Sequence, residues 1–276
     1  MQFKRIKINT QPSGGSLKFL YTTVFGRIIL KFLTRPFVSK VVGAFMNSRL
    51  SKRMIAKSVK NFKIDLSEYK NTEYKCYNDF FTREIKPENR PFSNGLVSPC
   101  DAKLTAYKIS DQSVFNIKGS EYALADILEN RSIAEKFKGG TCLIFRLCVD
   151  DYHRYAYFDD ATEFSHRFIK GVLHTVQPIA FLNNKVFYRN SREYTVLSTE
   201  HYGEAVQIEV GALCVGKINN HHKSGKHKKG EEKGMFLFGG STIIVLLNGV
   251  KILREITENT ECGYETVVKM GDKIGE

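Results

Sequence analysis

Apolar residues in the first sixty positions recur at the spacing of a helix, with basic residues interspersed. The pattern predicts a helix over residues 16–34, because Pro36 disfavours helical backbone in the residue before it. Basic residues spaced four apart, starting at Arg27, share one face of that helix. A second helical run is expected over residues 37–57. Neither run holds 18 uninterrupted apolar residues, so an amphipathic helix lying on a membrane surface is favoured over a spanning helix.

Further along the chain the pattern becomes that of strands. Residues 74–83 are expected to be helical or irregular, and a short helix is expected around residues 123–137. Strands are predicted over residues 141–149, 205–215, 241–247 and 250–256, and a hairpin is predicted to join 185–188 to 193–198. The expected fold class is therefore α+β, with a mainly β catalytic body over residues 61–276 and an amphipathic helical segment over residues 1–60.

Charge is distributed unevenly between these two parts. Residues 1–60 contain 13 Lys or Arg and no Asp or Glu, so they carry the whole formal excess of +13. A nucleic-acid-binding protein usually spreads basic residues over its folded face, and that class is excluded here. An anionic membrane surface is the expected partner, with peripheral attachment on the cytoplasmic side of the cell membrane. The open alternative is an ordinary amphipathic helix packed on the core. The six cysteines form no C-x-x-C pair, which indicates a reducing setting.

The stretch Gly239-Gly240-Ser241-Thr242 stands directly before an apolar strand. Glycine in that position usually marks a turn, but it also lets another group approach the backbone closely. If the Ser241 hydroxyl attacked the Gly240 carbonyl, the amide would become an ester, and elimination would leave Ser241 as an N-terminal pyruvoyl group. The nucleophile elbow G-x-S-x-G of α/β-hydrolases does not fit, because Ile243 occupies the second glycine position.

Five further motifs appear in a fixed order along the chain. They are NDFFTR at 78–83, KP and RP at 86–91, SPCDA at 98–102, DYHR at 151–154 and KGEEKG at 229–234. With the Gly-Ser-Thr junction they resemble the signature of the phosphatidylserine decarboxylases, over about residues 74 to 276. The resemblance implies self-cleavage at Gly240–Ser241 into chains 1–240 and 241–276 that remain associated. It also implies a covalent pyruvoyl cofactor from Ser241 and conversion of phosphatidylserine to phosphatidylethanolamine and carbon dioxide.

By the same resemblance, Asp101, His153 and Ser241 form the catalytic set. His153 is the expected base for the Ser241 hydroxyl and the proton donor to the substrate, and Asp101 is expected to orient it. The chain departs from the family pattern at Ala156, where many members carry a second histidine that could itself be the base. His174 stands where an aromatic residue is expected, and its role stays open.

The histidine- and lysine-rich stretch 219–233 lacks the convergent ligands of a metal site, so a solvated loop is expected and no metal is predicted. Three alternative functions stay open: a pyruvoyl decarboxylase of another serine lipid or amino acid, a membrane-binding homologue that does not cleave, and an ordinary serine hydrolase. The sequence also leaves open a homo-oligomer.

Overall fold

The computed structural model describes residues 2–8, 15–117, 120–177, 186–212, 218–221, 225–239 and 241–276. Its α-helices are α1 (Gly15–Thr22), α2 (Val24–Leu33), α3 (Pro36–Met46), α4 (Arg53–Phe62), α5 (Tyr77–Phe81), α6 (Leu124–Leu128), α7 (Arg131–Glu135), α9 (Val186–Arg189) and α10 (Arg254–Glu261), with 3-10 turns η2 (Arg49–Lys52), η3 (Leu66–Glu68) and η4 (Pro87–Asn89). Its strands are β1 (Arg5–Lys7), β2 (Leu96–Val97), β3 (Ala102–Lys108), β4 (Val114–Ile117), β5 (Ser120–Ala123), β6 (Thr141–Leu147), β7 (Arg154–Ala156), β8 (Ala161–Ile169), β9 (Arg192–Thr199), β10 (Gly203–Val210), β11 (Ile218–Asn220), β12 (Lys226–His227), β13 (Glu232–Phe236), β14 (Ser241–Leu247), β15 (Tyr264–Val268) and β16 (Lys273–Gly275). The predicted α+β class is confirmed.

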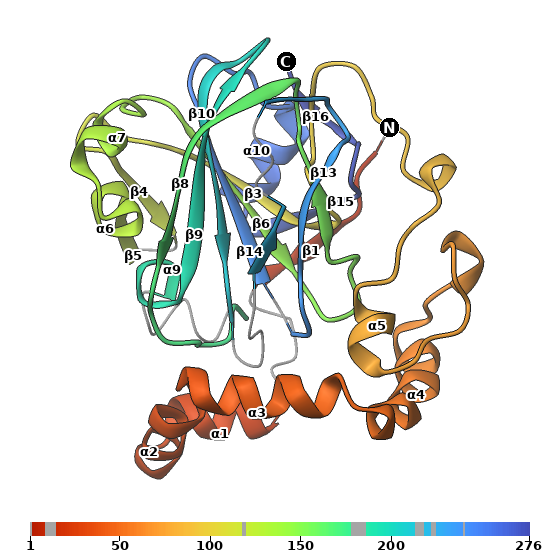
Figure 1. Ribbon diagram of the computed structural model, residues 1–276. Helices are drawn as coiled ribbons and strands as arrows, with labels where there is room; N and C mark the ends of the chain where they lie inside the picture. The colour runs from red at the N-terminus through yellow and green to blue at the C-terminus, as the bar shows by residue number, and fades with distance from the viewer. Residues whose placement is uncertain are drawn as a thin grey trace.

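A nine-stranded antiparallel sheet forms the body, in the order β1-β15-β3-β6-β14-β10-β9-β8-β12 (Figure 1). The strand that begins at Ser241, β14, lies between β6 and β10, and its first residue pairs with Leu147 of β6. A small sheet, β11-β13-β7, is separate from the large one. The predicted strand 241–247 therefore has its expected bounds, and it lies at the centre of the sheet.

Alternation of side chains along β14 supplies both halves of the core. Ile244 and Leu246 belong to one cluster, with residues of α6, α7 and α9. Ile243 and Val245 belong to the opposite cluster, with residues of the small sheet and Ile256 of α10. Because successive residues of a strand point to opposite faces, a strand buried on both sides is apolar throughout, which explains the unbroken apolar run.

Helices α1 to α4 form a separate region, here called the helical foot (residues 15–62), which lies at one end of the sheet (Figure 1). The helix expected over 16–34 is broken at Thr23, whose hydroxyl caps α2 by accepting a hydrogen bond from Gly26 N. Gly26 is required there, because an added Cβ would stand 2.1 Å from the Phe19 carbonyl oxygen. Within the described residues, no helix combines the length and the apolar character needed to cross a bilayer.

The foot is attached to the body through buried contacts. Tyr21 and Leu30 join the core cluster beside α6, and Leu173 N donates to the Thr34 carbonyl at 3.0 Å. His174, whose role the sequence left open, lies within 3.2 Å of the Tyr21 hydroxyl, and burial lowers its pKa to about 4. This histidine therefore contacts the helical foot.

Two predicted strands are wrong. Residues 186–189 form helix α9, and β9 finds its partners in β8 and β10 instead of a hairpin with that segment. Residues 254–261 form α10, because helical spacing turns Ile256 and Asn259 toward the core and leaves the other side chains polar. Lys185, at the start of the predicted hairpin, lies outside the described residues.

Two further predictions, for the start of the segment 1–60 and for the stretch 219–233, are corrected by the structure. Strand β1 pairs with β15, so the first residues of the segment 1–60 belong to the sheet and not to the foot. In the stretch 219–233, residues 219–220, 226–227 and 232–233 belong to strands, so the predicted solvated loop is only partly present among the described residues. Acidic partners explain the difference: His221 bonds to Glu232 at 2.7 Å, and Lys233 forms a fully buried ion pair with Glu209.

Candidate active site

Ser241 lies at the start of β14, where the chain enters the sheet. Its side chain is buried, and its hydroxyl has no hydrogen-bond partner among the described residues. Gly239 has a φ of 126°, a backbone conformation that strongly favours glycine. Gly240, the predicted residue on the other side of the cleaved bond, lies outside the described residues. The hydroxyl thus lies at a buried strand end, and the chain before it has a backbone conformation at Gly239 that glycine permits.

His153 lies just before β7 and is fully buried. Its Nδ1 is 2.9 Å from the Asp151 carbonyl oxygen, which can only accept, so Nδ1 carries the proton and Nε2 presents a lone pair. Burial lowers its pKa to about 3, and the charge of Arg83 adds to this effect, whereas the backbone of Asp151 and Gly239 opposes it. The imidazole is therefore neutral near pH 7 and lies beside the backbone of Gly239.

These two side chains have complementary unsatisfied atoms. Among the described residues, neither the buried Ser241 hydroxyl nor the buried His153 Nε2 has a hydrogen-bond partner. Unpaired buried polar atoms are rare in folded proteins and call for a functional explanation. A hydroxyl and a neutral imidazole nitrogen are the two groups needed for base-assisted nucleophilic attack.

Asp101 does not contact His153 by any hydrogen bond recorded between described residues. Its carboxylate instead accepts from Arg90 Nε at 2.9 Å and from Arg90 Nη2 at 2.6 Å. It also accepts from Met270 N at 2.8 Å. The expectation that Asp101 directly orients His153 therefore differs from the structure, because the guanidinium fork occupies both carboxylate oxygens. The predicted catalytic role of Asp101 stays a prediction.

The NDFF motif forms α5, which packs against the segment that leads to Ser241. Asn78 Oδ1 accepts a hydrogen bond from Phe238 N at 3.0 Å. The Phe81 ring lies 4.0 Å from the His153 ring and 5.4 Å from the Phe238 ring, measured between centroids. The motif thus fixes the Gly-Gly segment and encloses His153 in an apolar wall, which is the origin of its low pKa.

Asp151 is a site residue that sequence reasoning did not single out, although it belongs to the DYHR motif. Its carboxylate accepts from Lys103 Nζ and from Cys148 N, both at 2.7 Å, and burial raises its pKa to about 6. With Asp150 and Cys148 it offers three ligand atoms within 4.8 Å of one another. Lys103 already neutralises this cluster, and Arg146 Nη1 is 3.0 Å from the Cys148 sulfur, so the group fits a positioning network better than a metal site.

A cavity of about 410 Å³ adjoins the Asp101 network. Arg90 and Met270, both partners of Asp101, contribute to its wall. Ala156, the position of the second family histidine, also lines it, and Ala156 N donates to the Pro99 carbonyl at 2.9 Å. The small side chain at 156 therefore faces open space near Asp101.

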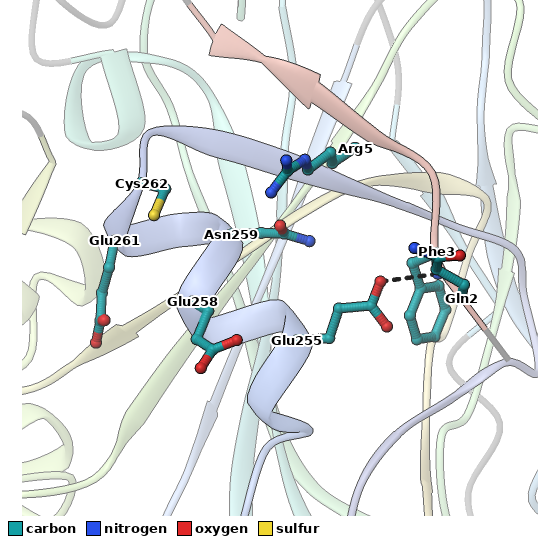
Figure 2. Close-up of a pocket in the computed structure, with 8 residues that line it drawn as sticks. All are labelled: Gln2, Phe3, Arg5, Glu255, Glu258, Asn259, Glu261 and Cys262. Atoms are coloured by element: carbon teal, nitrogen blue, oxygen red, sulfur yellow. Dashed lines mark hydrogen bonds between the residues drawn. The ribbon is translucent and has the colours of Figure 1, made fainter.

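Another cavity, of about 930 Å³, lies between β1 and α10. Figure 2 shows Glu255, Glu258 and Glu261 on α10, with Arg5 and Phe3 from the N-terminal strand segment nearby. Phe3 N donates to Glu255 Oε1 at 3.0 Å. None of the predicted site residues lines this cavity, so its size does not identify the reactive centre.

Comparison with known proteins shows the family to which this chain belongs. The family model described as phosphatidylserine decarboxylase matches residues 77–276. The chain is 46% identical to phosphatidylserine decarboxylase proenzyme 2 of Clostridium acetobutylicum, over 99% of this chain and 96% of that protein. It is 41% identical to the phosphatidylserine decarboxylase proenzyme of Clostridium botulinum, over 94% and 92% of the two chains. For the proenzyme of Clostridium kluyveri the identity is 40%, over 99% and 96%. The chain belongs to the phosphatidylserine decarboxylase family.

Proposed function

We propose that this chain is a phosphatidylserine decarboxylase proenzyme that cleaves itself between Gly240 and Ser241. The mature enzyme converts phosphatidylserine to phosphatidylethanolamine and carbon dioxide. One observation carries the proposal: the Ser241 hydroxyl is buried without a partner among the described residues, two residues after Gly239, which has a φ of 126° and whose backbone interacts with a neutral histidine. The family membership and the relatives' names support the same activity.

In the cleavage step, His153 Nε2 accepts the Ser241 proton as the hydroxyl oxygen bonds to the Gly240 carbonyl carbon. The C–N bond between the two residues then breaks and leaves an ester. Elimination frees the Gly240 carboxylate, and addition of water with loss of ammonia leaves a pyruvoyl group at the new chain start. Near pH 7 His153 is in the neutral form that can accept a proton, and because its pKa is only about 3 it is a weaker base than a free imidazole.

The residues present fit this cofactor. The orphaned Ser241 hydroxyl marks a buried atom that nothing in the described chain uses. Once formed, the pyruvoyl group would accept the electron pair of the substrate bond that breaks when the carboxylate leaves as carbon dioxide. The protein's own part is to hold position 241 through its backbone pairing with Leu147, to exclude water with Phe81 and Phe238, and to move protons at His153.

The two chains are expected to remain together after cleavage. The 241–276 chain supplies β14 at the centre of the sheet, paired on both sides, and β15, paired with β1 and β3. The β14 residues are all buried, so release would expose a central apolar strand. Cleavage therefore leaves the fold intact.

The helical foot brings the enzyme to its lipid. Its exposed large apolar side chains are Phe19, Val24, Phe25, Ile28, Phe32, Phe37, Val41, Phe45, Leu50, Met54 and Phe62. Exposed Lys and Arg residues accompany them, and no acid is present up to residue 60. Apolar insertion and attraction to anionic headgroups together favour peripheral binding to the cytoplasmic face of the cell membrane.

Intact mass of the purified protein tests the central proposal. Maturation gives a chain of 240 residues and a chain of 36 residues that starts with a pyruvoyl group. Replacing Ser241 with alanine gives a single chain with no decarboxylase activity. A wild-type chain that decarboxylates phosphatidylserine while remaining uncleaved contradicts the proposal.

A further inference from the structure

Arg83 ends the NDFFTR motif, two residues after α5. Its side chain is buried, with 2% of the residue exposed. Its positive charge is close enough to His153 to lower the pKa of that imidazole. The guanidinium is therefore a buried cation in the neighbourhood of the reactive centre.

The guanidinium has only part of its hydrogen-bonding capacity in use. Nη1 donates to the Phe80 carbonyl at 3.3 Å, while Nε and Nη2 have no acceptor among the described residues. The rings of Tyr69 and Phe80 lie 4.6 and 5.1 Å from its central carbon. Those rings favour a cation over their faces, but they leave the two N–H groups unbonded.

Other buried arginines of the described chain are satisfied. Arg90 has Asp101, and Arg146 bonds Glu265 through Nε at 2.7 Å and Nη2 at 2.5 Å. Arg192 donates to four carbonyl oxygens. Arg83 has no carboxylate within ion-pair distance in the described residues, so it differs from all three. A buried cation without a counter-charge is costly and is usually retained for a ligand.

The position of Arg83 suits a ligand that arrives from the membrane. Phe80 and Phe81 of α5 belong to a buried cluster with Met46 of α3, against which Ile55 and Val59 of α4 pack. Phe238, which precedes the Gly-Gly-Ser segment, also packs against this cluster. Arg83 thus lies where the helical foot meets the reactive centre.

We propose that Arg83 binds an oxyanion of the substrate headgroup through Nε and Nη2. The inference rests on the proposed function, because phosphatidylserine brings two such groups, its phosphate diester and its serine carboxylate. Either one matches the planar fork of a guanidinium, which donates two parallel hydrogen bonds. Arg83 is then the residue that holds the headgroup while His153 and position 241 act on it.

Binding to the uncleaved Ser241→Ala chain tests this without any cofactor. Calorimetry with glycerophosphoserine and with glycerophosphoethanolamine separates the two oxyanions, because only the first has a carboxylate. Adding Arg83→Gln is expected to weaken binding about tenfold or more, as for loss of charge-assisted hydrogen bonds. An equal loss for both ligands assigns the phosphate, and a loss for glycerophosphoserine alone assigns the carboxylate. Unchanged affinity for both ligands overturns the proposal.

Steady-state kinetics of the mature enzyme supply the second readout. Arg83→Gln is expected to raise KM for phosphatidylserine about tenfold. Arg83→Lys keeps the charge but loses the planar fork, so its KM is expected to lie between those of Arg83→Gln and the wild type. Arg131→Gln is the matched control, because Arg131 is exposed on α7 and its ion pair is with the neighbouring Glu135 of the same helix. Variants that cleave normally and keep the wild-type KM show that Arg83 is only a structural cation.

Two outcomes could confuse the interpretation, and both are separable. If Arg83→Gln does not fold, shown by loss of the thermal transition, Arg83→Lys alone decides the question by the same two measurements. If the wild-type chain neither cleaves nor turns over, the proposed function fails, while calorimetry on Ser241→Ala still tests Arg83.

Discussion

Apolar side chains are buried in the central strand β14 but exposed in the helical foot. All seven residues of β14 are buried, whereas Phe25, Ile28 and Phe32 of α2 are 64 to 66% exposed. Of the exposed large apolar side chains in the part of the chain that the structure describes, only Phe164 and Phe168 lie outside residues 19–62. Since exposed apolar patches mark contact surfaces, the two regions are adapted to different surroundings. The sheet forms its own core, whereas the foot leaves its apolar side chains exposed, as the proposed contact with a lipid surface requires.

The largest expected effect separates chemistry in the body from binding by the foot. His153→Ala should slow self-cleavage at least a hundredfold, the usual contribution of a general base, because the proposed proton acceptor Nε2 is removed. Gel electrophoresis over time measures the rate. The variant should still bind anionic vesicles as the wild type does. Cleavage at the wild-type rate would remove His153 as the base.

The pH dependence of stability tests whether His153 is a buried neutral imidazole in the body. The folded-state pKa of His153 is about 3, against 6.5 for the free side chain, so only the unfolded chain gains this proton as the pH falls from 6.5 towards 3. The contribution of His153 to the free energy of unfolding is therefore present above pH 6.5 and is lost as the pH falls. The loss is about 2 kcal/mol between pH 6.5 and 5. Urea unfolding of the single-chain Ser241→Ala protein measures the loss.

Two variants isolate the contribution of His153 from other titrating groups. His153→Asn in the same background should remove about 2 kcal/mol of the pH dependence. Asp151 acts in the opposite sense, because its raised pKa gives stability that is lost as the pH rises through about 6. His201→Asn is the control, since His201 is exposed and its pKa is raised by Asp159. Equal pH slopes for wild type and His153→Asn would contradict a buried neutral imidazole.

Exposure of the foot can be tested against equally exposed residues of the body. Replacing Phe25 and Phe32 with serine should weaken sedimentation with anionic vesicles about tenfold, because two inserting side chains are lost. The matched control replaces Phe164 and Phe168 of β8, which are exposed to a similar degree. Equal effects of the two pairs would move membrane contact away from the foot.

The smallest expected effect concerns Ala156 in the body. Ala156→His should accelerate self-cleavage about threefold, because the cavity beside Asp101 has room for an imidazole that can act as a second base. Arg90 holds both Asp101 oxygens and limits the gain. Ala156→Gln is the control for size. An unchanged cleavage rate would show that position 156 takes no part in this chain.

Local patterns predicted several features correctly. The strand 241–247, the helical N-terminus and the α+β class follow from periodicity, which depends on near neighbours in the chain. Motifs also predicted Ser241 and His153 as site residues, which stays a prediction, and the structure places the His153 imidazole beside the Gly239 backbone. Helix α9 and helix α10 were taken for strands, because their short apolar runs fit either structure and only the tertiary partners decide.

The sequence by itself determined the family and the separation of a cationic apolar foot from a neutral body, and it predicted the Gly240–Ser241 junction as the cleavage site. Only the tertiary structure showed that Asp101 pairs with Arg90 and that Asp151 contacts His153 through its carbonyl. It also showed that Arg83 has N–H groups without an acceptor among the described residues. The physical reason is range. Periodicity and motifs record neighbours along the chain, whereas burial, ion pairing and pKa depend on groups that folding brings together from distant segments.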